Sequence, residues 1–202
     1  MAKNNLRFFN INTMGDADNP DLCMLDNFVK GIETNSWRIF RGARLKDIYP
    51  DNARIYMDKE HRGIELSDLI GNTESMLIVN KRLKDLIHKH CGDEDVEYLP
   101  FDLYDHRKRL YSRDYFIINP IGTFDCLDLQ ASTLFRHPKN PDKILKVEKI
   151  VLDRKKMKGA PQLFRIDNDP TSYVLNFPLA KELSHMEPSN IIWAELPFTE
   201  DV

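Results

Sequence analysis

The sequence predicts a single α+β domain, residues 1–202, that contains more strand than helix. Two segments, residues 76–101 and 172–198, share one order of features: a short apolar run, an asparagine, a helix-patterned stretch, a second apolar run and the tripeptide Leu-Pro-Phe. Prolines crowd the second half of the chain, which favours short strands and tight connections over long helices. We therefore expect a strand-rich domain organised around two strand-helix-strand units that form a degenerate internal repeat.

Hydrophobic periodicity predicts the elements of the N-terminal third. Residues 6–11 form an apolar run typical of a strand, and residues 12–21, rich in Gly, Asp, Asn and Pro, predict a loop. Across residues 22–29 apolar side chains recur at helical spacing and a glycine follows shortly, which predicts a first helix. Residues 36–40 and 53–57 then predict two short strands.

The two repeat units carry the clearest helix signals. In the first unit, residues 76–79 predict a strand, and Asn80 is suited to cap the following helix because its side-chain oxygen can accept a backbone N–H of the first turn. Gly92 is placed to end this helix before a second strand at residues 96–99. In the second unit, Asn176 holds the corresponding position between an apolar run, residues 173–175, and a helix-patterned stretch.

The segment between the units predicts further strands. Residues 115–120, 121–129 and 143–152 carry the apolar patterns expected of strands. Residues 101–113 are polar and charged, and they predict a solvated loop between two strands. The basic run at residues 154–158 has no interleaved aromatic residue on which a nucleobase could stack, so we expect a turn there.

Charge is balanced over the whole chain but not along it. Lys and Arg number 29 against 32 Asp and Glu, and the net charge of -3 predicts neither nucleic acid nor an anionic membrane as a partner. Residues 136–165 hold ten basic and three acidic residues, whereas residues 166–202 hold one basic and seven acidic residues. This asymmetry supplies a surface on which a charged partner could dock.

Cysteine usage and hydropathy predict a cytoplasmic protein. Cys23, Cys91 and Cys126 are an odd number without a Cys-x-x-Cys pair, which indicates free thiols in a reducing compartment. The N-terminus lacks the apolar core of a signal peptide, and no apolar run approaches the roughly 20 residues that a membrane span needs.

One short segment contains the residue types of a zinc site. His88, His90, Cys91 and Asp93 could all serve as zinc ligands. On a helix, however, His88 and His90 point roughly 200° apart, which prevents them from sharing an ion. We therefore expect His90 at the edge of the core, His88 in solvent and no metal.

A second segment allows an enzymatic interpretation. Asp102, Asp105 and His106, followed by basic residues 107–109, are the residue types of a general base beside a phosphate-binding cluster. A hydrolase or nuclease is therefore an alternative function, although a solvated loop contains the same residue types. Cys126 lies between two aspartates, whose charges would raise its thiol pKa, so we expect it to pack in the core. The sequence has no glycine-rich phosphate loop and no nucleophile elbow, and no cofactor is predicted.

Acidic residues beside both repeat strands form either a solvated rim or a docking face for a basic protein. In the second interpretation, aromatic residues in the same strands would act as anchors, and the charges would mainly speed association. The candidate partner-binding residues are Asp93, Glu94, Asp95, Glu97, Tyr98, Trp193 and Glu195.

The order of the segments over residues 66–196 resembles a known bacterial family. The segments that carry the resemblance are Asp68-Leu69-Ile70, Met76-Leu77-Ile78-Val79-Asn80-Lys81-Arg82-Leu83, Val96-Glu97-Tyr98-Leu99-Pro100, Tyr115-Phe116-Ile117-Ile118-Asn119, Asp125-Cys126-Leu127-Asp128, Ile150-Val151-Leu152-Asp153, Leu163-Phe164-Arg165 and the second helix unit. They are similar to the immunity proteins of polymorphic toxin systems, first catalogued as a domain of unknown function. We expect an immunity-protein-like region over residues 66–198 and an N-terminal part, residues 1–65, without this resemblance.

The resemblance implies a cytoplasmic protein that binds a cognate toxin domain and blocks it. Such a protein needs no chemistry of its own, which agrees with the lack of a catalytic motif. Two alternatives from other classes remain: the hydrolase or nuclease described above, and a structural homo-oligomer in which the repeat strands pair between chains.

Overall fold

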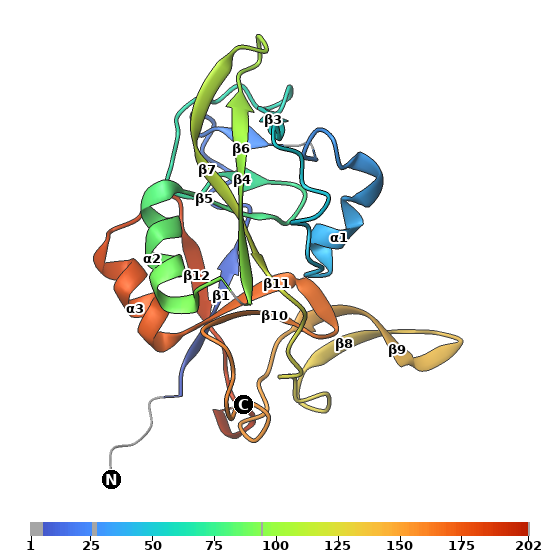
Figure 1. The fold of residues 1–202 in the computed structure, drawn as a ribbon. Coiled ribbons are helices and arrows are strands. Elements are labelled where there is room, and N and C mark those ends of the chain that lie inside the picture. The colour runs from blue at the N-terminus through green and yellow to red at the C-terminus, as the bar shows by residue number, and fades with distance from the viewer. Residues whose placement is uncertain (1–5, 26–27, 94, 202) are drawn as a thin grey trace.

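The computed structural model describes residues 6–25, 28–93 and 95–201 (Figure 1). Its strands are β1 (Phe8–Asn12), β2 (Met24–Leu25), β3 (Arg54–Tyr56), β4 (Gly71–Asn72), β5 (Leu77–Asn80), β6 (Val96–Tyr104), β7 (Leu110–Pro120), β8 (Thr133–His137), β9 (Asn140–Lys149), β10 (Leu163–Ile166), β11 (Asp169–Asn176) and β12 (Ile192–Glu195). Its helices are α1 (Trp37–Phe40), α2 (Lys81–Cys91) and α3 (Phe177–His185), with 3-10 turns η1 (Glu33–Asn35) and η2 (Thr199–Asp201). These elements confirm the predicted strand-rich α+β domain.

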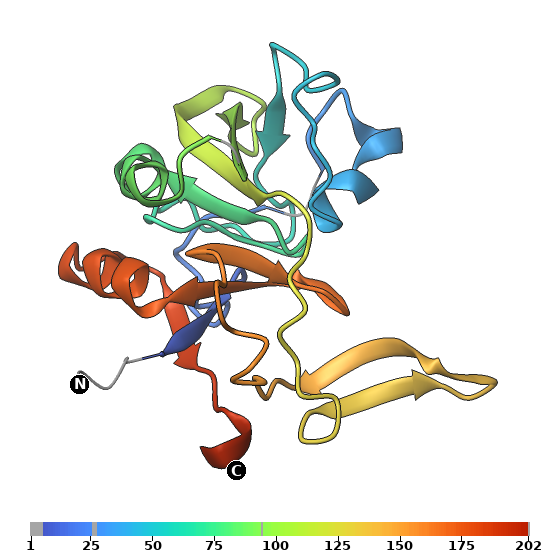
Figure 2. The same ribbon diagram turned by 60° about the horizontal axis from the view of Figure 1, so that its bottom comes forward.

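Most described strands belong to two four-stranded sheets. One sheet has the order β3-β6-β7-β5 and the other the order β10-β11-β1-β12. Helices α2 and α3 lie side by side along one flank of the two sheets (Figure 1). Strands β8 and β9 pair only with each other and project from the body as a hairpin (Figure 2). Phe135 on this hairpin is 60% exposed.

The two strand-helix-strand units have the same topology. Strands β5 and β6 are joined by α2 and lie on either side of β7, and strands β11 and β12 are joined by α3 and lie on either side of β1. Asn80 caps its helix as expected, its Oδ1 accepting the N–H of Leu83, and Asn176 in the corresponding position accepts the N–H of Leu179 through its Oδ1, each at 3.1 Å. The shared topology is consistent with a duplication, which stays a prediction.

A buried carboxylate ties the two units together. Asp68 accepts hydrogen bonds from Asn80 Nδ2 at 2.6 Å and from the backbone N–H of Ser189 at 2.7 Å. Its second oxygen is also 2.7 Å from the guanidinium of Arg82 on α2. The helix cap of the first unit is thereby fixed to the loop that precedes the last strand of the second unit.

Alternation along the strands divides the core into layers. On β5, Ile78 points toward a cluster under the N-terminal loops, while Leu77 and Val79 point toward a second cluster between the sheets and helices α2 and α3. A third cluster lies on the far side of the second sheet, where Cys126 is buried as expected. Burial of this apolar surface is the main favourable term in the stability of the fold.

Two predictions for the N-terminal third are wrong. Over the predicted helix at 22–29, Met24–Leu25 instead forms β2 and pairs with β4 in parallel register, while residues 26 and 27 lie outside the described residues. Leu25 and Val29 lie four residues apart and are buried in one cluster, which mimics helical spacing without a helix. The predicted strand at 36–40 is the short helix α1. Polar Ser36 and Arg38 alternate with apolar Trp37 and Ile39 as in a strand, but the helix leaves Trp37 exposed and buries Ile39.

The segment between the units also differs in part from expectation. The expected loop at residues 101–113 is shorter, because β6 continues to Tyr104 and β7 begins at Leu110. Residues 121–129 form no strand; they follow an irregular path with isolated bridges from Phe124 to Ile166 of β10 and from Leu127 to Leu152. The strands at 53–57, 115–120 and 143–152 and the turn at 154–158 are confirmed within a few residues.

Candidate functional site

Strand β6 has one edge that is only half covered. Along its whole length β6 pairs antiparallel with β7. On its other side, β3 pairs with it only from Asp102 to Tyr104. Among the described residues, the segment Val96–Phe101 therefore has a ladder partner on one side alone.

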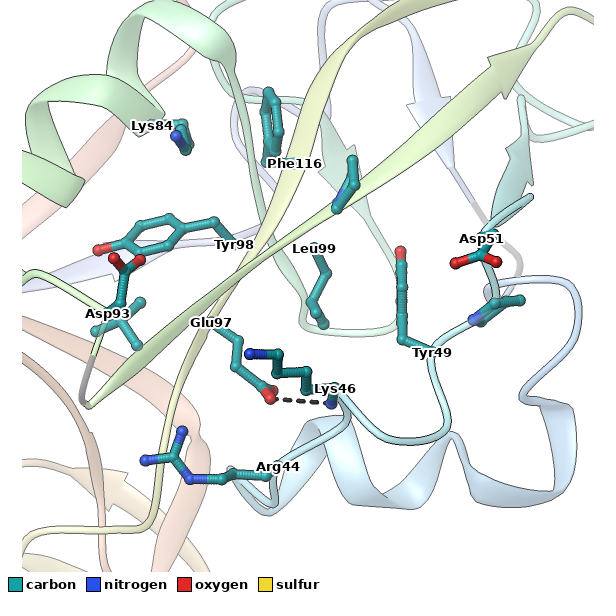
Figure 3. A pocket seen from close by; sticks show the side chains of 13 residues that line it. Arg44, Lys46, Tyr49, Asp51, Lys84, Asp93, Glu97, Tyr98, Leu99 and Phe116 are labelled. Atoms are coloured by element: carbon teal, nitrogen blue, oxygen red, sulfur yellow. Dashed lines mark hydrogen bonds between the residues drawn. The ribbon is translucent and has the colours of Figure 1, made fainter.

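An open groove of about 730 Å³ runs beside this half-covered edge (Figure 3). Its walls are β6, the start of α2 and the loop that precedes β3. In Figure 3, Tyr98 and Lys84 lie on one side of the strand, and Tyr49 and Asp51 lie on the other. The lining residues are Arg44, Lys46, Tyr49, Pro50, Asp51, Lys84, Asp93, Val96, Glu97, Tyr98, Leu99, Pro100 and Phe116.

Glu97 holds the loop wall of the groove in place. Its side chain is buried, with the residue 8% exposed, and both carboxylate oxygens accept the backbone N–H of Leu45 at 3.0–3.1 Å. Oε1 also accepts the N–H of Lys46 at 3.0 Å (Figure 3). Oε2 accepts Nδ2 of Asn119 at 3.0 Å. Glu97 is thus a support inside the groove and does not contribute to an exposed acidic rim.

A buried arginine extends this network to the second sheet. Arg165, on β10, is 0% exposed and donates from Nη2 to Asn119 Oδ1 at 3.2 Å. It also donates to the carbonyl oxygens of Pro120 at 3.2 Å and Pro170 at 2.6 Å, and its guanidinium lies 4.3 Å from the ring centroid of Tyr173. The charge is compensated by these acceptors and the aromatic ring. The position of the loop that precedes β3 and lines the groove therefore depends on both sheets.

Tyr98 is fixed in an aromatic and cationic environment. Its hydroxyl donates to the carbonyl of Gly92 at 2.9 Å, and its ring meets the His88 ring edge to face at 5.0 Å. Lys84 Nζ lies 5.4 Å from the ring centroids of both Tyr98 and Phe116. Burial, followed by the nearby Cys91 and Asp93, raises the pKa of the Tyr98 phenol above its usual range. Tyr98 is therefore a neutral, preorganised aromatic surface, as an interface anchor requires.

Tyr49 is the second aromatic residue of the groove. Its hydroxyl is buried and finds no hydrogen-bond partner among the described residues. Burial raises the pKa of this phenol well above its usual range, so the hydroxyl keeps its proton. A buried donor without a partner is costly, and a ligand in the groove could satisfy it.

The other candidate residues fall into two separate places. Asp93 and Asp95 are exposed; Asp93 lines the groove and its Oδ1 lies 3.1 Å from His88 Nε2, whereas Asp95 directly precedes β6. Glu94 lies outside the described residues. Trp193 and Glu195 belong to β12 in the other sheet. The structure thus brings Asp93, Asp95 and Tyr98 together but does not join them to the second pair.

Beside β12, the candidate residues Trp193 and Glu195 lie in a second cluster of aromatic and charged side chains. Glu195 forms a two-point ion pair with Arg7, at 2.7 and 2.6 Å. The Arg7 guanidinium in turn stacks 4.8 Å from the ring centroid of Phe177. Trp193 is partly exposed and lines a hollow of about 190 Å³ with Phe177 and Phe9. Because Glu195 is paired within the chain, its charge is largely compensated.

The residues of the enzymatic alternative have structural partners. Asp105 Oδ1 accepts the backbone N–H groups of Arg107 and Arg109, and its Oδ2 accepts the Arg109 guanidinium, so this carboxylate closes the β6–β7 turn. Asp102 Oδ1 lies 3.1 Å from Arg113 Nε. Neither ring nitrogen of His106 has a hydrogen-bond partner in the part of the chain that the structure describes. The geometry therefore does not assemble Asp105 and His106 into an acid-base pair.

The zinc-type residues are likewise separated. His88 faces Asp93, whereas His90 Nδ1 lies 2.8 Å from Gln162 Oε1 on the other side of the helix. No three His, Cys, Asp or Glu side chains converge as metal ligands within residues 6–25, 28–93 and 95–200.

Comparison with known proteins identifies the family. The model of the immunity protein family (Imm11) matches residues 9–195, so the chain belongs to this family of immunity proteins. The match confirms the resemblance and extends it to the N-terminal third. No curated protein matches the chain. In the described residues, no helix has the length and apolar character to cross a membrane.

Proposed function

We propose that this chain is a stoichiometric inhibitor that binds one cognate bacterial toxin and covers its active site. Membership of the immunity protein family over residues 9–195 carries this proposal. Inhibition by cover requires a preorganised surface and no reaction, and the groove beside β6 is such a surface. The protein would act in the cytoplasm of a bacterium that makes, or is exposed to, a toxin of a polymorphic system used in competition between bacteria.

The groove face is the proposed toxin-binding surface. Tyr98 is held rigid by its hydrogen bond to Gly92 and can serve as the buried anchor of the interface. Asp93 lines the groove and the exposed Asp95 directly precedes β6, and both charges would speed encounter with a basic toxin. Glu94 continues the same acidic run in the sequence. Trp193 and Glu195 on β12 would form a second, separate contact.

The proposal is tested by recovering the partner and measuring inhibition. The tagged chain is expressed in its native cell, the bound protein is eluted in high salt and identified by mass spectrometry, and the recovered toxin domain is produced for activity assays. We expect a large secreted protein whose C-terminal domain binds one to one, with activity falling linearly to zero at an equimolar ratio. Elution at high salt is expected because surface charges are screened.

A negative result has a clear meaning if the cells make the toxin. Recovery of the chain alone, with no stoichiometric partner and no loss of toxin activity on mixing, would refute the inhibitor proposal. Light scattering on the same sample would then test for a homo-oligomer. A hydrolase screen would begin with His106→Ala, because the enzymatic interpretation assigns the general base to His106.

A further inference from the structure

We infer that the toxin inserts an extended segment beside the half-covered edge of β6, where it becomes an additional strand in line with β3. This inference rests on the proposed inhibitor function and specifies how the toxin would bind. Strand addition supplies affinity through main-chain hydrogen bonds and specificity through alternate side chains.

The direction of the backbone groups supports strand addition. The N–H of Asp102 donates to the carbonyl of Ala53 at 2.8 Å, which shows that Asp102 directs its backbone groups away from β7. The ladder register shifts between Phe101 and Leu103, but burial along β6 alternates without interruption from Glu97 to Leu103, so Pro100 and Tyr98 direct their backbone groups to the same side as Asp102. Pro100 has no N–H to donate, which fits its position on an edge. The groove therefore offers the carbonyls of Tyr98 and Pro100 and the N–H of Tyr98.

The size of the open edge suits a short strand. Residues 96–101 extend for about 20 Å at the usual rise per residue, enough to pair with a segment of about five residues. Beyond this segment β3 blocks the edge. The incoming strand would thus end where β3 begins.

The walls of the groove indicate the chemistry of the segment. Lys46 and Asp51 are exposed on the loop wall, and neither forms an ion pair with another described residue. A segment with an acidic side chain opposite Lys46 and a basic one opposite Asp51 would complement both charges. The Tyr49 hydroxyl, which is buried and has no hydrogen-bond partner in the described part of the chain, would bond to the segment as well.

A second copy of the chain is a less suitable occupant. Self-pairing of two β6 edges would bring a proline without a donor into the new ladder, and proline on an edge strand is a device that discourages such pairing. The same proline leaves its carbonyl available to a foreign strand. The edge is therefore better suited to one foreign segment than to another β6.

The test compares two substitutions at one position. Tyr98→Ala removes the aromatic side chain and keeps the N–H, whereas Tyr98→Pro removes both. Neither change removes a hydrogen bond to β7, because the backbone groups of residue 98 face the groove. Affinity for the recombinant toxin domain recovered in the pull-down is measured by calorimetry. We expect Tyr98→Pro to bind at least about tenfold more weakly than Tyr98→Ala.

Amide hydrogen exchange provides an independent measurement on the unmodified chain. The Tyr98 amide should exchange rapidly in the free protein and be slowed at least about 100-fold in the complex. The Leu99 amide is the internal control, because it faces β7 and should be protected in both states. If circular dichroism shows that Tyr98→Pro does not fold, hydrogen exchange on the unmodified chain alone tests strand addition.

Each alternative outcome is distinct. Equal affinities of the two variants together with an unprotected Tyr98 amide in a neutralised complex would overturn strand addition and leave the inhibitor function intact. A Tyr98 amide already protected in the free protein, with a dimeric mass by light scattering, would assign the edge to a second copy and overturn the inference. If the unmodified chain binds no toxin domain, the inference and the proposed function both fail.

Discussion

Replacement of Glu97 by alanine should destabilise the protein by about 2–4 kcal/mol. The substitution leaves the backbone N–H groups of Leu45 and Lys46 without their acceptor. An unsatisfied buried donor costs about 1–3 kcal/mol, and partial access of water to Lys46 reduces its share. Loss of the hydrogen bond to Asn119 costs less, because Asn119 Nδ2 still donates to the carbonyl of Ala43 at 3.0 Å. Glu97→Gln, which keeps one acceptor oxygen, should cost about half as much.

Urea unfolding followed by circular dichroism measures this loss. Asp95→Ala is the matched control, because it removes an exposed carboxylate two residues away and should change stability by no more than about 0.5 kcal/mol. Fitting with a common slope separates a change in stability from a change in the unfolded state. If Glu97→Ala unfolds at the same urea concentration as Asp95→Ala, the assignment of Glu97 as a buried support of the groove loop is incorrect.

Two further predictions concern titratable groups. Burial favours the neutral form of Asp68, but hydrogen bonds, the strongest from Arg82, outweigh it and hold its pKa below the usual range. Its stabilisation should therefore be complete above about pH 5 and decline as the pH falls through the unfolded-state pKa and then the lowered native pKa. The difference in urea midpoint between the unmodified chain and Asp68→Asn should accordingly shrink between about pH 5 and pH 2, and a constant difference would contradict this. Burial raises the thiol pKa to about 12 at Cys23 and Cys126 and to about 11 at the less buried Cys91. Ellman's reagent at pH 8 should therefore react slowly with Cys91, and it should react with Cys23 and Cys126 only in denaturant. Fast reaction of all three thiols in the native state would refute this assignment.

Local patterns were sufficient to predict the helix caps. Asn80 and Asn176 precede amphipathic stretches, and the hydrogen bond that a cap makes lies within three residues of it, so its recognition needs no tertiary information. The strands on either side follow from short apolar runs. The predicted helix at 22–29 failed because its apolar residues are buried by distant segments, including β4, which the local pattern does not contain.

The candidate site was harder to predict because its parts are non-local. Glu97 lies in an acidic stretch of the sequence, yet its partners Leu45 and Lys46 are about 50 residues away. The open edge of β6 exists because β3 is short, and that length is visible only when the sheet is assembled. A carboxylate within an alternating apolar strand, on the same side as Leu99 and Phe101, was the one available signal that Glu97 points inward.

The position of β1 has a consequence for the order in which the protein can fold. Phe9 pairs with Leu175 on one side and Glu195 on the other, so the second sheet cannot be completed until nearly the whole chain has been made. The sheet beside the groove consists of strands within residues 54–120, so it can form before the rest of the chain has been synthesised. At about 5–20 residues per second, the 75 residues from 121 to 195 take roughly 4–15 s to synthesise. Arg165, which contacts the groove network from the second sheet, is synthesised within that interval, so the loop beside the groove can reach its final position only after this lag.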